Sequence, residues 1–163
     1  MENERNDQTR VREKQFTYNT GVRWSGGKIG TLSTNGREPL RVSSPPEFKG
    51  TPGLWTPEDM FVGALEMCQL LTFLALAKRR NISIVSYSST ASGNLELVNG
   101  GFRFTKIVIT PIVGVADPAA EDEVLALVSQ AHHHCLVANS VSSTVEVNAT
   151  VIIEEPEGVP SPL

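Results

Sequence analysis

Two cysteines are the residues of this chain best suited to chemistry. Cys68 lies within a long apolar run, and Cys135 ends the polar segment AHHHC. A buried cysteine is by default a small apolar side chain. The polar residues Glu66 and Gln69 share the apolar run with Cys68, and burying such groups without partners is costly. We therefore expect polar groups to meet at this point of the fold, and the two cysteines to form a thiol working site together.

Three histidines precede Cys135, and imidazole and thiolate are both zinc ligands. Adjacent residues of a helix point about 100° apart, so His132, His133 and His134 cannot all converge on one ion. We expect no metal site; one histidine is expected to pack near Cys135 and influence its ionisation, with the others solvated. The sequence has no Gly-rich phosphate loop, nucleophile elbow or paired carboxylates, so no cofactor is expected.

Composition narrows the possible classes of protein. The 163 residues are 40% apolar, which is enough for one buried core. The net charge is -4 and the charges are interleaved, so neither nucleic acid nor a membrane surface is an expected partner. The charged N-terminus lacks an apolar signal segment, which predicts a cytoplasmic protein with reduced thiols. We expect polar tails at 1–13 and 154–163 and a single domain at 14–153.

The first half of the chain predicts three strands and then a helix. Alternation from 15 to 24 and the glycines that follow predict a hairpin with 28–34, and a short strand is expected at 40–43. A proline-rich loop over 45–55 is expected to be neither helix nor central strand. Thr56 is suited to cap a helix that begins at Pro57 and runs through a nearly continuous apolar stretch. A helix that is apolar all round is expected to be buried, and about 18 residues containing Glu66 and Gln69 fit a membrane span poorly.

The second half predicts a long hairpin, a second helix and a last strand. β-Branched segments at 83–97 and 102–115 are joined by Asn99-Gly100-Gly101, a strong turn signal. Asp117 and Pro118 are expected to open a helix that ends near Cys135, and 144–153 alternates like a strand. The order β-β-β-α-β-β-α-β predicts an α+β fold with a mostly antiparallel sheet.

Three segments taken together resemble one known family. They are YNTGVRWSGGKIGTLSTNG, TPEDMFVGALEMCQLLTFLALAKRRNI and AHHHCLVANSV. The Pro-Glu at the start of a long apolar helix, a cysteine ten residues after that glutamate and a second cysteine at the end of a late helix are similar to the OsmC/Ohr family of osmotically induced and organic hydroperoxide resistance proteins. The resemblance covers about 140 residues.

The resemblance implies an intertwined homodimer with its long helices at the centre. It also implies peroxidase activity on organic hydroperoxides, with Cys68 as the peroxidatic and Cys135 as the resolving residue, followed by reduction by a dithiol. The implied chemistry is a sulfenic acid at Cys68 that condenses with a nearby thiol. The apolar residues Phe61, Leu65 and Leu71 are expected to form the substrate-binding surroundings of Cys68.

A thiolate at neutral pH needs a stabilising neighbour, which in the peroxidase branch of the family is an arginine held by the glutamate of the Pro-Glu motif. That glutamate matches Glu58, and the arginine position corresponds to Lys28. A lysine supplies a point charge but no bidentate fork. Ten residues on one helix separate Glu58 from Cys68 by about 15 Å, so a shared site would need Glu58 from an antiparallel helix of a second subunit.

Two further functions stay open at this point. Lys28, Glu66 and Trp55 depart from the expected pattern, and a buried carboxylate beside a thiol would raise the pKa of that thiol. One alternative is therefore a binding module of the same fold, for an apolar ligand or a thiol, with little or no peroxidase activity. The other is a structural dimeric domain with two inert cysteines.

Overall fold

The computed structural model describes residues 15–155 in two compact units that divide between Trp55 and Thr56. Each unit is described by itself. The tails expected at 1–13 and over most of 154–163 lie outside the described residues, and the single domain expected at 14–153 stays a prediction.

The N-terminal unit is a three-stranded antiparallel meander. Its strands are β1 (Gly21–Trp24), β2 (Ile29–Ser33) and β3 (Leu40–Ser43), in the order β1-β2-β3. The predicted hairpin and third strand are confirmed, although β1 begins at Gly21 and residues 15–20 form no strand. The following loop contains a single 3-10 turn, η1 (Pro46–Phe48), where a helix was not expected; the fixed φ of proline suits the first position of such a turn.

The long helix of the C-terminal unit, α1 (Pro57–Arg79), begins where the sequence predicts. Thr56 accepts a hydrogen bond from the Asp59 N–H at 3.0 Å, and the Asp59 carboxylate accepts one from the Thr56 N–H at 3.0 Å. This reciprocal pair is a capping box, which satisfies two main-chain donors at the helix start. Lys78 and Arg79 lie in the last turn, where positive charge complements the helix dipole.

A long hairpin of β4 (Ser86–Val98) and β5 (Gly101–Val115) forms the centre of the second sheet. Asn99 and Gly100 both have positive φ, 52° and 83°, as a tight two-residue hairpin turn requires. Alternate residues of β4 face solvent, whereas Ile107, Ile109, Val113 and Val115 of β5 are buried. β5 is therefore the central strand of the core.

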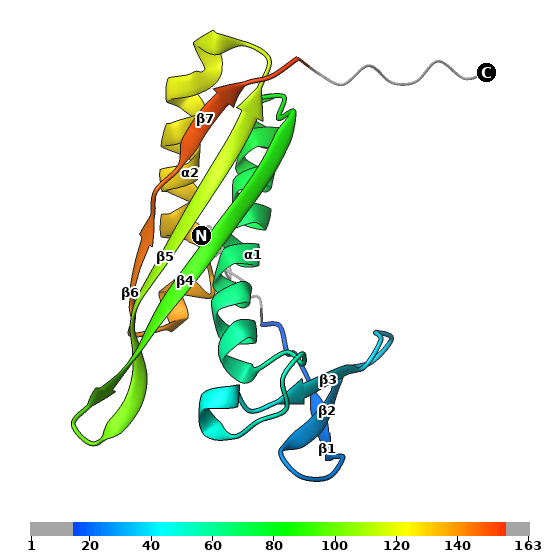
Figure 1. The fold of residues 1–163 in the computed structure, drawn as a ribbon. Helices are drawn as coiled ribbons and strands as arrows, with labels where there is room; N and C mark the ends of the chain where they lie inside the picture. Colours follow the sequence, from blue (N-terminus) through cyan, green and yellow to red (C-terminus); the bar gives the residue numbers. More distant parts are fainter. Residues whose placement is uncertain (1–14, 156–163) are drawn as a thin grey trace, which may run out of the picture. The chain divides into compact units, whose positions relative to one another are not determined.

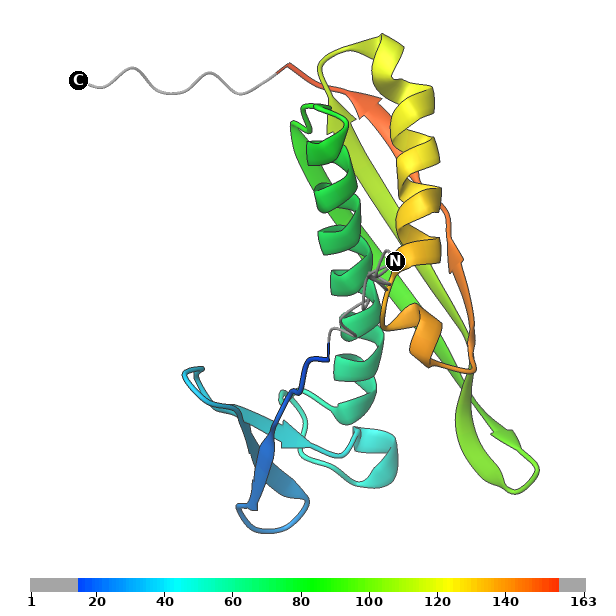
Figure 2. The ribbon, with the colours of Figure 1, turned by 180° about the vertical axis from the view of Figure 1, so that it is seen from behind.

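The chain after β5 crosses back over the sheet. It forms a 3-10 turn, η2 (Pro118–Ala120), then α2 (Glu121–His134), a second 3-10 turn, η3 (Ala138–Ser140), and the strands β6 (Thr144–Val147) and β7 (Thr150–Ile153). Both strands pair with β5 in parallel, so the predicted last strand is divided in two at 148–149. The two helices lie side by side and cover one face of this sheet (Figures 1 and 2). The predicted α+β class is confirmed.

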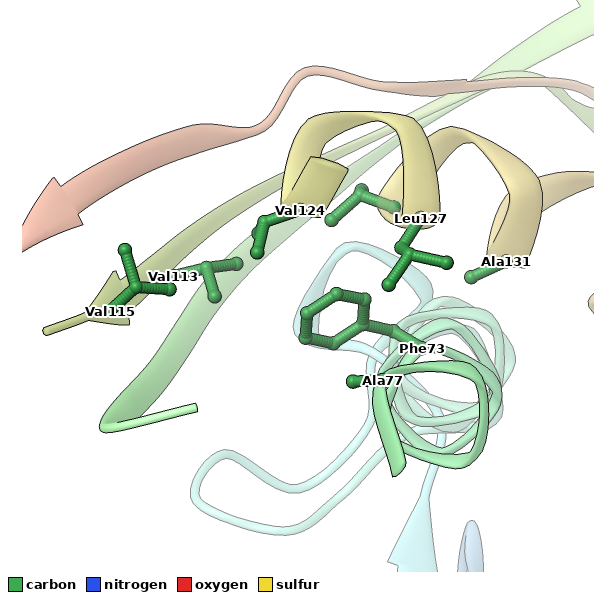
Figure 3. Close-up of a cluster of buried hydrophobic side chains, with 8 residues drawn as sticks. Phe73, Ala77, Val113, Val115, Val124, Leu127 and Ala131 are labelled. Carbon is green, nitrogen blue, oxygen red and sulfur yellow. The ribbon is translucent and has the colours of Figure 1, made fainter. Parts of the chain in front are cut away.

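The main core lies between the two helices and β5. Phe73 is fully buried and points from α1 toward α2 (Figure 3). Around it gather small and branched side chains from α1, β5 and α2: Ala77, Val113, Val115, Val124, Leu127, Val128 and Ala131. This packing fixes α2 against α1 and thereby sets the position of the end of α2, where Cys135 lies.

α1 is apolar all round, but the single chain buries only one stripe of it. Leu65, Gln69, Phe73 and Ala77 are buried at four-residue spacing. Met67, Leu71 and Leu74 on the other side are 52%, 59% and 39% exposed. By length and composition α1 could also cross a membrane, but its buried stripe packs in the core. We call the side with Met67, Leu71 and Leu74 the exposed face of α1. The sequence predicts that this face is buried, but no other described residues cover it.

Candidate active site

The two cysteines, far apart in sequence, meet at the contact of α1 with the end of α2. Cys68 is partly buried in the middle of α1, and Cys135 follows the last residue of α2 and is 1% exposed. Both are free thiols, and hydrogen bonding between them contributes to the pKa shift of each. The buried Gln69 side chain, next to Cys68 in the chain, donates to the main-chain oxygen of Val128 of α2 at 2.9 Å and so fastens the two helices together. The sequence alone could not show that Cys68 and Cys135 lie close together.

The turn after α2 presents main-chain donors to both sulfurs. Cys135 adopts an extended conformation, with ψ at 112°, and so ends the helix. Hydrogen bonding from the main chain of Val137 and Leu136 contributes to lowering the pKa of Cys68. The Ala138 N–H donates to Cys135 Sγ at 3.4 Å, and the Asn139 N–H donates to the Cys135 main-chain oxygen at 3.0 Å. The turn therefore holds Cys135 and also favours ionisation of the other thiol.

The surroundings move the pKa values of the two thiols in opposite directions. Burial raises the pKa of Cys68, but hydrogen bonds from Cys135, Val137, Thr72 and Leu136 outweigh it, so the pKa of Cys68 is lowered from its ordinary value. Burial and the hydrogen bond to Cys68 raise the pKa of Cys135 to about 11. The thiolate is the nucleophilic form of cysteine. The pair therefore consists of one thiol prepared to ionise and one that stays protonated.

This difference predicts selective alkylation of the reduced protein. At neutral pH, iodoacetamide should modify Cys68 and leave Cys135 intact, since the lower pKa of Cys68 gives it the larger thiolate fraction and Cys135 is also shielded from solvent. Peptide mapping by mass spectrometry after short exposure measures both sites in one sample. Preferential labelling of Cys135 in the folded protein would contradict the assignment, and the unfolded protein, in which both label alike, is the control.

Glu58 lies in the first turn of α1, ten residues before Cys68 on one continuous helix. The rise of about 15 Å over that separation keeps it from its own Cys68. Its Oε2 atom is buried and has no hydrogen-bond partner among the described residues. A buried carboxylate oxygen without a partner is costly, which indicates that a donor or a cation belongs beside it.

Lys28 belongs to the N-terminal unit, in the turn that joins β1 to β2. It is exposed, and its Nζ donates to the main-chain oxygen of Phe48 in the same unit. Its predicted role as the positive neighbour of the thiols stays a prediction.

The three apolar residues predicted to line a substrate site have different surroundings. Leu65 is fully buried and packs with Ile107 and Ile109, so it belongs to the core rather than to an open wall. Phe61 is half-buried and stacks on Phe104, with ring centroids 4.9 Å apart. Leu71 is 59% exposed on the exposed face of α1. Of these three residues, only Phe61 and Leu71 therefore offer accessible surface.

Glu66 does not act on the thiol as the sequence suggests. Two residues along a helix amount to about 200° of rotation, which turns Glu66 away from Cys68. Its carboxylate accepts a hydrogen bond from Ser89 Oγ of β4 at 2.5 Å. Burial and this carboxylate together raise the pKa of the nearby Tyr87. Glu66 therefore finds its polar partners on the sheet, and the pKa of Cys68 is lowered rather than raised.

The three histidines do not gather as ligands. His132 is half-buried and lies near His133, with ring centroids 5.5 Å apart, and His134 Nδ1 interacts with the Gln130 main-chain oxygen at 2.8 Å. Burial and the neighbouring His133 lower the pKa of His132. Within residues 15–155, no three His, Cys, Asp or Glu side chains lie close enough together to hold a metal ion.

Sequence reasoning missed the contributions of Val137, Thr72 and Leu136 to the lowered pKa of Cys68. Thr72 follows Cys68 by four residues, which places the two side chains on one face of a helix, so its signal was present in the spacing. No sequence pattern predicts the contribution of the two main-chain groups, because it depends on how the chain turns after α2.

Two helices on one face of a sheet, each contributing one cysteine to a shared pair, define an α+β thiol protein. The family model for OsmC-like proteins matches residues 50–150, and the chain belongs to the OsmC-like family. The predicted resemblance is therefore confirmed, and α1 is the core helix of a soluble family.

Individual relatives agree with this assignment. The uncharacterized protein YmaD of Bacillus subtilis is 27% identical over 130 residues, 76% of this chain and 85% of YmaD. An OsmC-like protein of unknown function from Vibrio cholerae has a TM-score of 0.76 at 24% identity, covering 83% of this chain and 100% of the other. An organic hydroperoxide resistance protein, OsmC, from Legionella pneumophila has a TM-score of 0.68 at 24% identity, with coverage of 85% and 98%. These structures share the fold.

Proposed function

We propose that this protein is a cysteine-based peroxidase that reduces organic hydroperoxides in the cytoplasm. The observation that carries the proposal is the contact between two reduced thiols whose pKa values are moved apart, downward at Cys68 and to about 11 at Cys135. A peroxidatic cysteine must react as a thiolate, whereas a resolving cysteine must survive as a thiol until a sulfenic acid forms. The two sites match these two requirements.

The reaction has two steps at the protein. The Cys68 thiolate attacks the terminal oxygen of the hydroperoxide, the O–O bond breaks, and the alkoxide takes a proton and leaves as the alcohol. Cys68 is then a sulfenic acid. The Cys135 thiol attacks its sulfur and releases water, which leaves a Cys68–Cys135 disulfide. The peroxide has gained two electrons, and the two cysteines have lost them.

An external dithiol completes the cycle by thiol–disulfide exchange. Cys135 is 1% exposed, whereas Cys68 is partly open to solvent. Attack is therefore expected at the Cys68 sulfur, giving a mixed disulfide there and releasing Cys135. The second thiol of the reductant then displaces Cys68 and becomes oxidised itself.

The apolar surroundings of Cys68 favour an organic hydroperoxide over hydrogen peroxide. Phe61 and Leu71 provide apolar surface on the same helix, and apolar burial adds binding free energy that hydrogen peroxide cannot gain. Structural relatives from Legionella pneumophila and Elizabethkingia anophelis are named organic hydroperoxide resistance proteins.

The test is dithiol-dependent consumption of cumene hydroperoxide compared with hydrogen peroxide. A kcat/KM at least about tenfold higher for cumene hydroperoxide is expected. Absence of turnover with both peroxides would overturn the proposal in favour of a binding module for an apolar ligand or a thiol.

The same proposal includes a homodimer formed through the exposed face of α1. Met67, Leu71 and Leu74 are exposed apolar side chains that recur at helical spacing, and a two-fold axis lets an identical face cover them. The proposal also assigns Glu58 of one subunit to the Cys68 site of the other, where its unpartnered oxygen could hold a cation. Lys28 is the proposed cation.

Replacing Leu71 with glutamate should dissociate this dimer, because it places an unpaired charge in an apolar interface. Sedimentation should show a species near twice the 17.7 kDa chain mass for the unaltered protein and a monomer for Leu71→Glu. Ser129→Glu, on an exposed position of α2, is the matched control and should leave the dimer intact. A monomer for the unaltered protein at the same concentration would contradict the dimer.

A further inference from the structure

Two buried polar atoms of the C-terminal unit, one on each helix, have no hydrogen-bond partner among the described residues. One is Oε1 of Gln69, whose side chain is 1% exposed, and the other is Nδ1 of His132, a half-buried residue. Buried polar side-chain atoms almost always have a partner, which is either a protein group or an internal water molecule. The two atoms therefore indicate a polar partner for each of them between the helices.

A single main-chain oxygen connects the two side chains. Gln69 Nε2 donates to the main-chain oxygen of Val128 at 2.9 Å, which places the amide of Gln69 directly against α2. Helical geometry directs the His132 N–H to the same oxygen, because His132 follows Val128 by four residues within α2. Side chains of a helix lean toward its N-terminus, so the His132 ring leans back toward Val128. Both unpartnered atoms are therefore brought to the same point of the helix contact.

We infer that one internal water molecule bridges Gln69 Oε1 and His132 Nδ1, and that His132 is thereby a positioning residue for Cys135. The inference deepens the proposed peroxidase function and rests on it. A water molecule spans two polar atoms up to about 5.5 Å apart through two ordinary hydrogen bonds. It donates to the amide oxygen of Gln69, which can only accept. Either tautomer of the imidazole completes the bridge, because water both donates and accepts.

The bridge acts on the two chain segments that carry the thiols. Gln69 follows Cys68 directly on α1, and the main-chain oxygen of His132 accepts a hydrogen bond from the Cys135 N–H at 3.2 Å. After Cys68 is oxidised, the sulfur of Cys135 must reach the sulfur of Cys68 to form the disulfide. Such a step is sensitive to small displacements of the reacting atoms. Holding the last turn of α2 against α1 therefore keeps Cys135 in place for the resolving step.

A histidine at this position has a simpler alternative role, which is to fill space at the end of α2. That role depends on the size of the side chain and not on which of its atoms is polar. Asparagine and glutamine separate the two roles, because the amide of asparagine lies near the Nδ1 position of an imidazole and the amide of glutamine lies near the Nε2 position. The bridge requires a polar atom at the Nδ1 position only.

The experiment follows the resolving step with dithiobis(nitrobenzoic acid), an aromatic disulfide. Cys68 displaces one coloured thionitrobenzoate and forms a mixed disulfide, and Cys135 then attacks the Cys68 sulfur and displaces the second. Loss of one hydrogen-bonded bridge should slow the second release by about three- to tenfold in His132→Leu and His132→Gln. His132→Asn should stay within about twofold of the unaltered protein. His134→Leu, at an exposed position of the same helical turn, is the matched control and should have no effect.

Two further measurements address the bridge itself. Gln69→Met removes the amide with little change of shape, so the double variant Gln69→Met/His132→Leu should be no slower in the second release than the slower of the two single variants. A crystal structure of the reduced protein should show one water oxygen within about 3 Å of both Gln69 Oε1 and His132 Nδ1.

A second release that is as fast in His132→Gln as in the unaltered protein, or as slow in His132→Asn as in His132→Leu, overturns the inference. Slowing in the double variant equal to the product of the two single effects, or a crystal structure without a water molecule between the two atoms, also overturns it. The release assay contains no peroxide, so its result is independent of whether the protein turns over hydroperoxides. Urea denaturation of each variant confirms that the compared proteins are folded.

Discussion

Exchange of Cys68 for serine is expected to abolish hydroperoxide reduction, with a fall in kcat/KM of about a thousandfold or more. A serine hydroxyl does not ionise near neutral pH and cannot form a sulfenic acid, so neither step of the cycle can begin. The measurement is dithiol-dependent consumption of cumene hydroperoxide by Cys68→Ser beside the unaltered protein. Retention of even a tenth of the activity would show that the chemistry lies elsewhere.

The matched control is Cys135→Ser, which removes the resolving thiol but leaves the nucleophile. Its first turnover should proceed and stop at a Cys68 sulfenic acid, which a dimedone label detects by mass spectrometry. Since hydrogen bonding from Cys135 contributes to lowering the pKa of Cys68, the rate of that turnover should fall somewhat. Dimedone labelling in Cys68→Ser would contradict the assigned roles.

Replacing Phe73 with alanine should give a large loss of stability, about 3–5 kcal/mol. Phe73 is fully buried between α1, β5 and α2, so truncation leaves a cavity in the packing that holds the two helices together (Figure 3). Urea denaturation at fixed protein concentration measures the change, because a dimer makes stability depend on concentration. Loosening α2 should also separate the thiols and slow formation of the disulfide.

Leu97→Ala is the control for this substitution. Leu97 is an apolar residue that is 65% exposed near the tip of the β4–β5 hairpin, and its truncation should change stability by no more than about 0.5 kcal/mol. Equal losses from the two variants would contradict the assignment of Phe73 to the main core.

Local sequence signals predicted most of the helices, strands and turns. The differences between the predicted and observed strands arise from pairing between segments that are distant in the sequence. Thr56 and Pro57 predicted the start of α1, and Asn99-Gly100 predicted the hairpin turn, because caps and tight turns depend on a few neighbouring residues. The division of the last strand at 148–149 was not predicted. There the Asn148 N–H donates to the Ile109 main-chain oxygen at 2.9 Å, a contact that depends on β5.

The site was predictable in residue type and less so in arrangement. Cys68 and Cys135 were identified as a pair, but their contact depends on the packing of Phe73 against α2, which no local pattern encodes. Leu65 was expected beside the substrate and lies in the core, since apolar residue type alone does not separate a pocket wall from a core position. Glu66 was expected beside the thiol and bonds Ser89, because the position of β4 was not known from sequence.

The most direct test of the account is a count of thiols after treatment of the fully reduced protein with one equivalent of cumene hydroperoxide. The account predicts rapid loss of both thiols and, on peptide mapping, a Cys68–Cys135 disulfide that does not form in Cys68→Ser. Survival of both thiols, or a disulfide between two Cys68 residues of different chains, would contradict it.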